Sequence, residues 1–484
     1  MRPKVFLINE PYVKDFNRAQ RWAARTRGRV IRAPDWLAYA TAVLERAGIE
    51  ARLFDFPASD WTKDKLRTLV KREKPDFVVL DSTTPSIYSD IECARICKEE
   101  SSAKTIMVGP HASALPEETL RTADGSVDVV CIGEYDLTVL DVVQSYPDLR
   151  AVKGIAYSEG TRIIRTEARP FIADLDSLPF PAWHQLDLMK YFDGSKLYPH
   201  VDIFSGRGCA HRCSFCLWPQ VMHGHQVRLR SPQSVVDEME ADLALCPWLH
   251  RWGEFFFEDD TFTLVKSNAA AICEEILRRG LKVRFSINAR ADTADRELFR
   301  LLKRAGCRQI LVGFESGDER VLKLMNKRES LSEGRRLMQI ASETRLDVHG
   351  CFVLGFPGET PESLENTIRY ALSLGLKTVQ FSAAVPFPGT KFYKDCVESG
   401  FMDACRWDEW LNGGEQTPVI QCPGLTKAAV SDAVDRGLRA FYLRPRYMAD
   451  FLFSTRNLSD LYRKMRGAVH FLSYLLTEYC RRSA

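Results

Sequence analysis

Three cysteines in the middle of the chain, Cys209, Cys213 and Cys216, have a spacing that suits a metal centre. They follow an apolar segment in VDIFSGRGCAHRCSFC, so a strand is expected to run into the loop that holds them. Three thiolates spaced in this way can each bind one iron of a [4Fe–4S] cube and leave the fourth iron open. The alternative is a zinc site with His211 as the fourth ligand, although zinc sites usually come as paired Cys-x-x-Cys sets. The spacing favours the cluster and leaves zinc open.

The chain after these cysteines repeats a strand followed by a helix. Six apolar segments are expected to be strands, and amphipathic patterns separate them: VDIFSG, EFFFEDDT, KVRFSINAR, QILVGFESG, VHGCFVLGFPG and TVQFSAAVPFPG. Ser231–Pro232 and Thr360–Pro361 are typical of helix starts, while Gly280, Gly306 and Gly375 fall where helices should end. Repeated units with cysteines at the carboxyl end of the first strand predict a barrel whose site lies on that face.

The N-terminal third also alternates short apolar runs with helical patterns. Five strand-then-helix units predict a parallel sheet covered on both faces, which is the doubly wound class. Ligands of such sheets bind at the carboxyl ends of the strands. The residues expected there combine glycines with polar side chains: Asn9, Asp81, Ser82, Thr83, Gly109, His111, Gly133 and Glu134. Ordinary turns have a similar composition, so the residues alone predict no specific ligand.

The segments DSTTPS, GPHASALPEE and VDVVCIGEYD, in this order ahead of the cysteine loop, resemble the cobalamin-binding domain of cobalamin-dependent radical S-adenosylmethionine (SAM) enzymes. The Asp-x-His-x-x-Gly motif, whose His ligates cobalt in better-known cobalamin proteins, is missing from this domain. The resemblance therefore implies a cobalt without a lower His ligand, with His111 as the alternative. It implies cobalamin binding by Asn9, Ser82, Thr83, Gly109, His111, Gly133 and Glu134.

The six-strand region resembles the partial barrel of radical SAM enzymes. The resemblance implies that Phe215 contacts the adenine of SAM through its backbone and that Leu354 packs on the same ring. It further implies that the amino group is held at the end of the second strand, and the ribose and carboxylate at the ends of the third and fourth strands. The residues at these positions are Glu258, Asp259 and Asp260, then Ser286, Asn288 and Arg290, then Glu315 and Ser316.

These segments predict an α/β chain in four parts. A doubly wound, Rossmann-like cobalamin-binding domain is expected over residues 1–150, and a proline-containing linker over 151–198. A radical SAM partial (β/α)6 TIM barrel is expected over 199–400, and a helical region over 401–484. The last helix, within DLYRKMRGAVHFLSYLLTEYCRR, mixes basic residues with an apolar face. Such a helix either packs on the barrel or rests on a membrane surface as a peripheral contact.

The composition narrows the partners and the compartment. A formal net charge of +3 in 484 residues gives no reason to expect a nucleic-acid partner, and it disfavours a tRNA-modifying enzyme with a basic module. No apolar run approaches the roughly 18 residues of a transmembrane segment. The N-terminus turns polar after one short apolar stretch, which is not the pattern of a secretory signal. Because no export is expected, the 14 cysteines are interpreted as thiols or metal ligands. The expected location is cytoplasmic.

The residues and the resemblance together predict an enzyme with three cofactors: a [4Fe–4S] cluster, SAM and cobalamin. A flavodoxin or ferredoxin is the expected external electron donor, and no side chain is assigned a catalytic role beyond the cofactors. The leading hypothesis is that a 5′-deoxyadenosyl radical activates an unactivated carbon of a small or lipid-linked substrate, which is then methylated. A zinc-stabilised binding module without radical chemistry is the hypothesis from a different class.

A second radical hypothesis is ring contraction, cyclisation or rearrangement without methyl transfer. GRGCAHRCSFCLWPQ, GHQVRLRSP and FFFEDDTFT resemble the hopanoid-biosynthesis radical SAM protein family of the cyclitol ether pathway. That family is assigned a sugar-ring contraction on a lipid-linked substrate. The N-terminal stretch FNRAQRWAARTRGRVIRAPDWLAYA shares only a loose likeness with it, so the substrate is not inferred from the resemblance.

Overall fold

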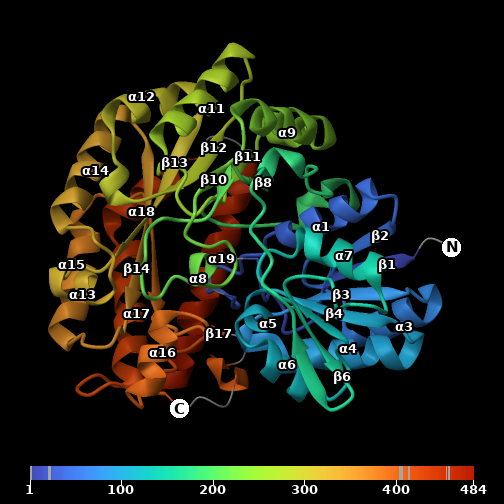
Figure 1. The fold of residues 1–484 in the computed structure, drawn as a ribbon. Helices are drawn as coiled ribbons and strands as arrows, with labels where there is room; N and C mark the ends of the chain where they lie inside the picture. The colour runs from blue at the N-terminus through green and yellow to red at the C-terminus, as the bar shows by residue number, and fades with distance from the viewer. Residues whose placement is uncertain are drawn as a thin grey trace.

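The computed structural model of the chain describes residues 3–19, 23–402, 407–412, 415–453, 455 and 458–483. Two α/β bodies lie side by side, the N-terminal one coloured blue to cyan and the second green to orange in Figure 1. Helices of the C-terminal region, in red, lie beside the second body.

The first body is a sheet whose strands are β1 (Lys4–Asn9), β2 (Glu50–Asp55), β3 (Phe77–Asp81), β4 (Lys104–Val108), β5 (Val129–Cys131), β6 (Ile155–Glu159) and β7 (Arg162–Arg165). The strand order is β2-β1-β3-β4-β5-β6-β7, and β1 to β5 are parallel. This confirms the doubly wound prediction. The strands β6 and β7 lie within the segment expected to be a linker; they pair antiparallel next to β5 and extend the first sheet.

Alternation along the strands explains why both faces of this sheet are covered. Val5 and Leu7 of β1 point into one apolar core, whereas Phe6 and Ile8 point into another on the opposite face. The first core includes α1 (Asp35–Arg46) and α7 (Asp136–Ser145), and the second includes α3 (Lys63–Glu73), α4 (Ile87–Ser101) and α6 (Pro116–Ala123). Two short helices, α2 (Phe56–Ser59) and α5 (Pro110–Ala114), follow β2 and β4.

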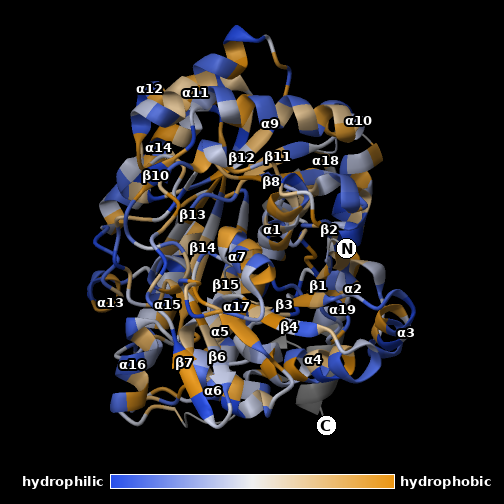
Figure 2. Cartoon of the chain, turned by 45° about the vertical axis from the view of Figure 1, so that its right-hand side comes forward, coloured by the Kyte–Doolittle hydropathy of each residue, from blue (hydrophilic) through white to orange (hydrophobic). Residues whose placement is uncertain are grey.

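The second body contains the six expected strands: β8 (His200–Ile203), β11 (Glu254–Phe257), β12 (Phe285–Ala289), β13 (Cys307–Glu315), β14 (Asp347–Leu354) and β15 (Thr378–Ala383). They are all parallel, in the order β15-β14-β13-β12-β11-β8, which is the partial barrel predicted from the sequence. Outer helices alternate polar and apolar residues around these strands (Figure 2): α9 (Pro232–Leu245), α10 (Pro247–Arg251), α11 (Lys266–Arg278), α12 (Arg296–Ala305), α13 (Glu319–Leu324), α14 (Leu331–Thr344) and α15 (Pro361–Ser373).

Helix boundaries in the barrel follow the predicted caps. The Ser231 side chain accepts a hydrogen bond from the Ser234 backbone at 3.1 Å, and Thr360 does the same for Ser363 at 3.2 Å. Gly306 ends α12 with φ +109°, and a Cβ at this position would lie 2.1 Å from the Val283 carbonyl oxygen. Only glycine fits such a close approach in this conformation.

A two-stranded ribbon closes the neck of the cysteine loop. Its strands, β9 (Gly206–Arg207) and β10 (Arg228–Leu229), pair antiparallel and enclose the loop with its helix α8 (Leu217–Val221). Arg207 donates to Asp136 at 2.8 and 3.0 Å, and Arg228 donates to Glu134 at 2.9 and 2.7 Å. All four side chains are buried, so two paired guanidinium groups join this neck to the first body.

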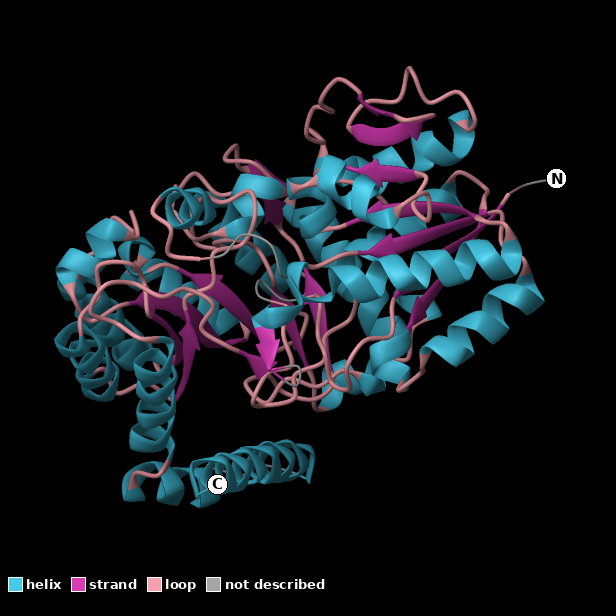
Figure 3. Cartoon of the chain, turned by 90° about the horizontal axis from the view of Figure 1, so that it is seen from below, coloured by secondary structure: helices cyan, strands magenta, loops and turns pink. Residues whose placement is uncertain are grey.

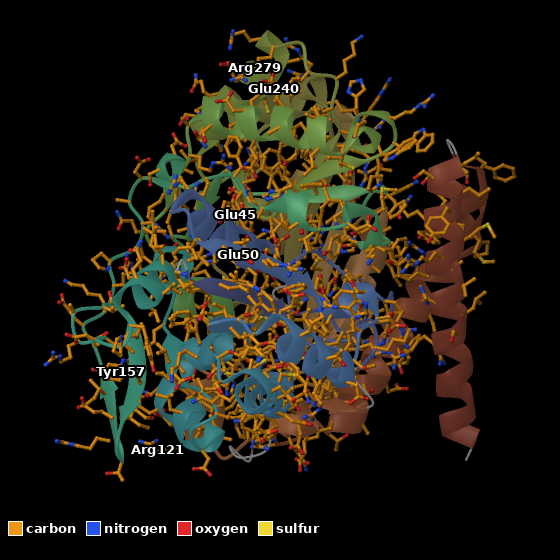
Figure 4. All side chains as sticks on the ribbon, turned by 90° about the vertical axis from the view of Figure 1, so that its right-hand side faces the viewer. Glu45, Glu50, Arg121, Tyr157, Glu240 and Arg279 are labelled. Atoms are coloured by element: carbon orange, nitrogen blue, oxygen red, sulfur yellow. The ribbon has the colours of Figure 1, made fainter. Side chains whose placement is uncertain are left out.

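The C-terminal region consists of α16 (Lys391–Glu398), a small hairpin of β16 (Leu411–Asn412) and β17 (Glu415–Gln416), α17 (Lys427–Tyr442), α18 (Pro445–Phe453) and α19 (Leu458–Ser483). Helix α17 packs against the edge strand β15. Helix α19 lies along the outside of the molecule, as Figures 3 and 4 show from two directions. None of the helices described has both the length and the apolar character that a membrane crossing requires.

The neck ion pairs make the stability of the chain sensitive to one carboxylate. The substitution Asp136→Ala leaves the buried Arg207 guanidinium without its bidentate partner, which should reduce the free energy of unfolding by about 3–5 kcal/mol. Chemical denaturation of the whole chain measures this change. The matched control is Glu297→Ala, which breaks the exposed pair with Arg300 and should have little effect. Equal effects of both substitutions would contradict a role for the neck pair.

Candidate functional site

A cavity of about 1670 Å³ occupies the barrel, and the cysteine loop forms part of its wall. All three cysteines line it. Its walls come from segments far apart in the sequence: residues 24–32 of the loop after β1, the interior of the barrel strands, and helices α17 to α19. The carboxyl end of the barrel therefore places the cysteines in the wall of a space large enough for a ligand of substantial size.

One side chain, Gln220, holds the cysteine loop from within. Its amide nitrogen lies 2.7 Å from the Cys216 carbonyl oxygen and 3.2 Å from those of Cys213 and Ser214. Its carbonyl oxygen accepts from the Lys391 backbone at 2.8 Å. A loop with few regular backbone bonds gains its shape from such side-chain donors. The sequence analysis assigned no role to Gln220, which lies in the WPQ segment at the end of the cysteine motif.

Two buried cations lie next to the loop. Arg290 approaches the Cys213 sulfur to 3.6 Å and also contacts Asp292 and Glu329, each at 2.9 Å. Lys327 donates to Glu315 at 3.3 Å. Burial opposes the charged form of Lys327, but Glu329 and Glu315 raise the pKa of this ammonium group above its usual value. Two cations thus lie where they can offset the negative charge of a cluster held by three cysteines.

Six of the ten predicted SAM residues line the cavity. Glu258 accepts from Arg32 at 2.9 Å, Asp260 lies 3.5 Å from His223, and Asn288 donates to the Asp259 carbonyl at 3.1 Å. This wall offers carboxylates for an ammonium group and hydroxyls, and cations for a carboxylate, which is the donor set that SAM requires. The six are Phe215, Glu258, Asp260, Asn288, Arg290 and Glu315.

The other four predicted SAM residues do not line the cavity. Asp259 ties the end of β11 to Ser205, with hydrogen bonds of 2.6 and 3.0 Å, and burial raises its pKa to about 7. Ser286 lies 3.3 Å from Glu254 below the cavity floor, and Ser316 lies 3.2 Å from Thr367. Leu354 packs in the outer core, and its neighbour Val353 lines the cavity instead. A shift of one residue along a strand exchanges the two faces, so these positions have structural contacts in place of cavity contacts.

Glu315 stands at a conformationally unusual point. Its φ of +62° lies in the left-handed region, and the pairing between β13 and β14 shifts between Gly313 and Glu315. A non-glycine residue with this backbone costs about 1 kcal/mol or more, so the surrounding contacts must hold it there. The bond from Lys327 is one such contact. This geometry turns the Glu315 carboxylate toward the cavity at the position where a ligand group was predicted.

A second group of charged residues lies deeper in the barrel and was missed in the sequence. The Arg32 guanidinium forms ion pairs with Asp193 at 3.0 Å and with Glu258 at 2.9 Å. It also lies 5.0 Å from the centroid of the Phe256 ring. Lys196 is fully buried with its ammonium 3.2 Å from the same ring centroid. Burial opposes ionisation of Asp193, but Lys196 and Arg32 hold its pKa well below the usual value. Arg32 and Asp193 lie in the N-terminal loop and the linker, where no local pattern marks them.

Asp202 on β8 is the uncompensated member of this group. Both of its carboxylate oxygens are buried without a hydrogen-bond partner among the described residues. Burial, which outweighs the attraction of Arg32, raises the pKa of Asp202 to about 7. The edge strand β8 therefore holds a buried carboxylate whose ionisation above neutral pH is unfavourable.

The predicted cobalamin residues gather at the carboxyl edge of the first sheet, where all but Gly109 and Gly133 have clearly buried polar side chains. Ser82 donates to the Val108 carbonyl at 2.6 Å, His111 lies 3.2 Å from Thr84, and Asn9 donates to Asp55 at 3.0 Å. Burial lowers the pKa of His111 to about 3, so its imidazole is neutral. None of the seven residues lines the barrel cavity. Their role in binding cobalamin stays a prediction.

This edge nevertheless contains buried polar atoms that suit an amide-rich ligand such as cobalamin. The Glu10 carboxylate oxygens and the Tyr135 hydroxyl have no hydrogen-bond partner within the described part of the chain. Glu10 follows β1, and Tyr135 precedes α7 after β5. Buried polar groups of this kind are normally satisfied. The residues present at the edge therefore fit the cofactor, with Glu10 and Tyr135 as groups that the sequence analysis did not single out.

The loop contacts of Gln220 predict how firmly a cluster is held. The variant Gln220→Ala loses donors to three carbonyls, so a reconstituted cluster should lose iron to a chelator roughly ten-fold faster. Absorbance and iron content measure the loss over time. The exposed Gln339→Ala is the matched control and should behave as the parent. Cys213→Ala should retain no cubane cluster, and unchanged iron in that variant would contradict the assigned ligands.

The buried Asp202 predicts a pH-dependent gain in stability on its removal. Because the folded chain holds the Asp202 proton up to about pH 7 and the unfolded chain releases it near 3.8, ionisation increasingly opposes folding between these values. Asp202→Asn should therefore add about 2–4 kcal/mol to the free energy of unfolding at pH 8 and much less at pH 4. Denaturation at both pH values, with exposed Asp64→Asn as control, tests this; a pH-independent gain would contradict it.

Comparison with protein families identifies both bodies. The radical SAM superfamily matches residues 203–371, and the B12 binding domain matches residues 32–143. These matches lie within the predicted barrel and the predicted cobalamin domain, and they confirm the cluster, SAM and cobalamin as cofactors. The hypothesis of a zinc-stabilised binding module is wrong, because the cysteine loop lies in a radical SAM domain. Among the described residues, no group of three His, Cys, Asp or Glu side chains is arranged to hold a single metal ion.

Individual relatives agree with this assignment. The chain is 28% identical to an uncharacterized methyltransferase of Pyrococcus horikoshii, over 87% of this chain and 90% of the relative. It is 29% identical to the anaerobic magnesium-protoporphyrin IX monomethyl ester cyclase of Cereibacter sphaeroides, over 85% and 67%. The fold matches the radical SAM methyltransferase TsrM of Kitasatospora setae with a TM-score of 0.70 and 20% identity, over 93% and 90%. The finer resemblance to the cyclitol ether family stays a prediction. With a radical SAM domain over residues 203–371 and a B12 binding domain over residues 32–143, these matches together support a cobalamin-dependent radical SAM enzyme.

Proposed function

We propose that this enzyme methylates an unactivated carbon of a small or lipid-linked substrate held in the barrel cavity. The observation that carries the proposal is the neck of the cysteine loop, which is bound to the B12 domain through Arg207 and Arg228. One loop thus connects the cluster ligands to the domain of the second cofactor. The methyltransferases among the relatives support methyl transfer.

When bound, the cluster and SAM supply a 5′-deoxyadenosyl radical that removes a substrate hydrogen atom, and cobalamin supplies the methyl group. The chain's own residues position these groups. Cys209, Cys213 and Cys216 hold the cluster, and Gln220 holds their loop. The carboxylates and cations of the cavity wall bind the polar groups of SAM. A flavodoxin or ferredoxin is the proposed source of the electron.

Apolar side chains keep water from the radical region. Cys213, Phe215 and Val353 belong to one buried cluster with Phe356 and Phe392, whose rings stack 4.5 Å apart. A closed apolar wall on this side holds the reacting groups in place and keeps solvent out. The wall thus serves the selectivity of the reaction.

The walls of the cavity away from the cysteines are of two kinds. The barrel floor contributes polar groups such as Gln309, His349 and Thr378, and His349 lies 2.7 Å from Thr378. The side formed by α17 to α19 contributes larger apolar surfaces, including Tyr447, Met448 and Phe451. A substrate with both polar and apolar parts suits such a cavity, which supports a small or lipid-linked molecule.

The alternative is a cyclisation or rearrangement without methyl transfer. The similarity to the magnesium-protoporphyrin cyclase supports this alternative, although the relatives support methyl transfer better. The same cavity and the same cluster loop serve both outcomes, because both begin with removal of a substrate hydrogen atom. The fate of the methyl group of SAM separates them.

Labelled SAM provides the test of methyl transfer. Reconstituted enzyme is incubated under anaerobic conditions with CD3-labelled SAM, a reductant, and lipid and small-molecule extracts from cells lacking the gene. Mass spectrometry should detect a product carrying the CD3 group, together with 5′-deoxyadenosine and S-adenosylhomocysteine. The Cys213→Ala variant is the control and should give none of these. An unlabelled product formed with 5′-deoxyadenosine but without S-adenosylhomocysteine would exclude methylation and favour the alternative.

A further inference from the structure

The C-terminal helix α19 has two faces of opposite character. Its inner face contacts the body: Arg463 donates to the Gly194 carbonyl at 2.5 Å, Lys464 to the Phe451 carbonyl at 2.9 Å, and Tyr474 to Asp435. Asp460 accepts from Arg463 at 2.6 Å and is buried. Arg27 of the N-terminal loop lies 5.0 Å from the Tyr474 ring centroid. The side of α19 that meets the protein is therefore mainly polar.

The outer face is apolar and exposed. Residues spaced three, four or seven apart lie on one side of a helix, and here they form one row. The row begins at the start of α19 and continues for more than three turns of this helix, which lies on the outside of the molecule in Figure 4. Its members are between 41% and 83% exposed: Leu458, Leu461, Tyr462, Met465, Val469 and Leu472.

This arrangement reverses the usual amphipathic helix of a folded protein. A surface helix normally buries its apolar stripe against the core and exposes its charges. Here the charged Asp460 and Lys464 are buried. The apolar Met465 and Val469 of the same helix are 59% and 61% exposed. A contiguous apolar row of this length on a protein surface marks a site of contact.

The charge of the region indicates what the row contacts. Residues 443–484 contain eight Lys or Arg and three Asp or Glu, of which Arg463, Lys464 and Asp460 face the body. The other six basic and two acidic residues are still net positive, whereas the whole chain carries only +3, so residues 1–442 are net negative. A second copy paired along α19 would bring two such basic segments together. An anionic lipid surface, in contrast, attracts them. We propose that α19 lies flat on an anionic bilayer, with the row from Leu458 to Leu472 in its interface.

The position of α19 connects this contact to the cavity. Asp460, Arg463 and Lys464 line the cavity from the inner face of the same helix. Helix α19 therefore separates the cavity from the bilayer by the width of one helix. The contact does not depend on which radical reaction the enzyme performs, because Met465 and Val469 at the middle of the row do not line the cavity; of the row, Leu472 at its far end does.

Vesicle binding by the full-length protein tests the proposal. The protein should co-sediment with phosphatidylcholine vesicles that contain phosphatidylglycerol, bind weakly to pure phosphatidylcholine, and dissociate as salt is raised. The double variant Met465→Glu and Val469→Glu should reduce partitioning at least roughly ten-fold, since two apolar groups leave the interface and two like charges enter it. Cluster content and circular dichroism of the variant should equal those of the parent.

The matched control places the same charges on exposed apolar residues elsewhere. Leu245→Glu and Leu324→Glu alter side chains that are 45% and 46% exposed on the outer barrel helices, and they should leave vesicle binding unchanged. Light scattering after size exclusion gives the oligomeric state of each protein. A dimer that the Met465 and Val469 substitutions dissociate, without vesicle binding by the parent, would overturn the proposal in favour of a second copy. Binding that the substitutions do not reduce would overturn it as well.

Discussion

Two buried arginines determine how the halves of this molecule meet. Arg207 and Arg228 stand on the two strands that close the neck of the cysteine loop, and each pairs with a carboxylate after β5 of the first sheet. A guanidinium group is too costly to bury alone, so the neck can close only where Glu134 and Asp136 are in place. The loop that carries Cys209, Cys213 and Cys216 thus takes its position from both domains. The geometry at the cluster depends on the N-terminal sheet as much as on the barrel.

The walls of the cavity come from segments that are far apart in the sequence. The barrel of six strands is open between β15 and β8, and other segments must complete the wall. Arg32 from the loop after β1, Asp193 from the linker, and Arg463 from α19 all reach the cavity. Their charges are neutralised locally, as Arg32 is by Asp193 and Glu258. The exception is Asp202 on the edge strand β8, whose buried carboxylate has no hydrogen-bond partner among the described residues.

The sequence predicted what is determined by local patterns. Alternation of apolar residues identified the strands of both sheets, and caps such as Ser231 and Gly306 identified helix ends, because these signals lie within a few residues of the element. The cysteine spacing identified the cluster loop for the same reason. Side-chain direction was less certain: Leu354 was assigned to the cavity, but its strand presents Val353 there. Asp259, Ser286 and Ser316 have the expected polar character but bond to neighbouring elements. Pairs such as Arg228 with Glu134 join residues far apart in the sequence, and no pattern within either segment reveals them.

The late position of α19 in the chain also bears on assembly. A ribosome releases the cysteine loop and the whole barrel before it releases residues 458–483, so the side of the cavity that α19 lines is the last to be completed. During this interval the cysteines lie in a nearly finished barrel that is still open from the side. The wall of the cavity on that side is therefore fixed only after the segments that hold the cluster ligands and the barrel strands have been synthesised.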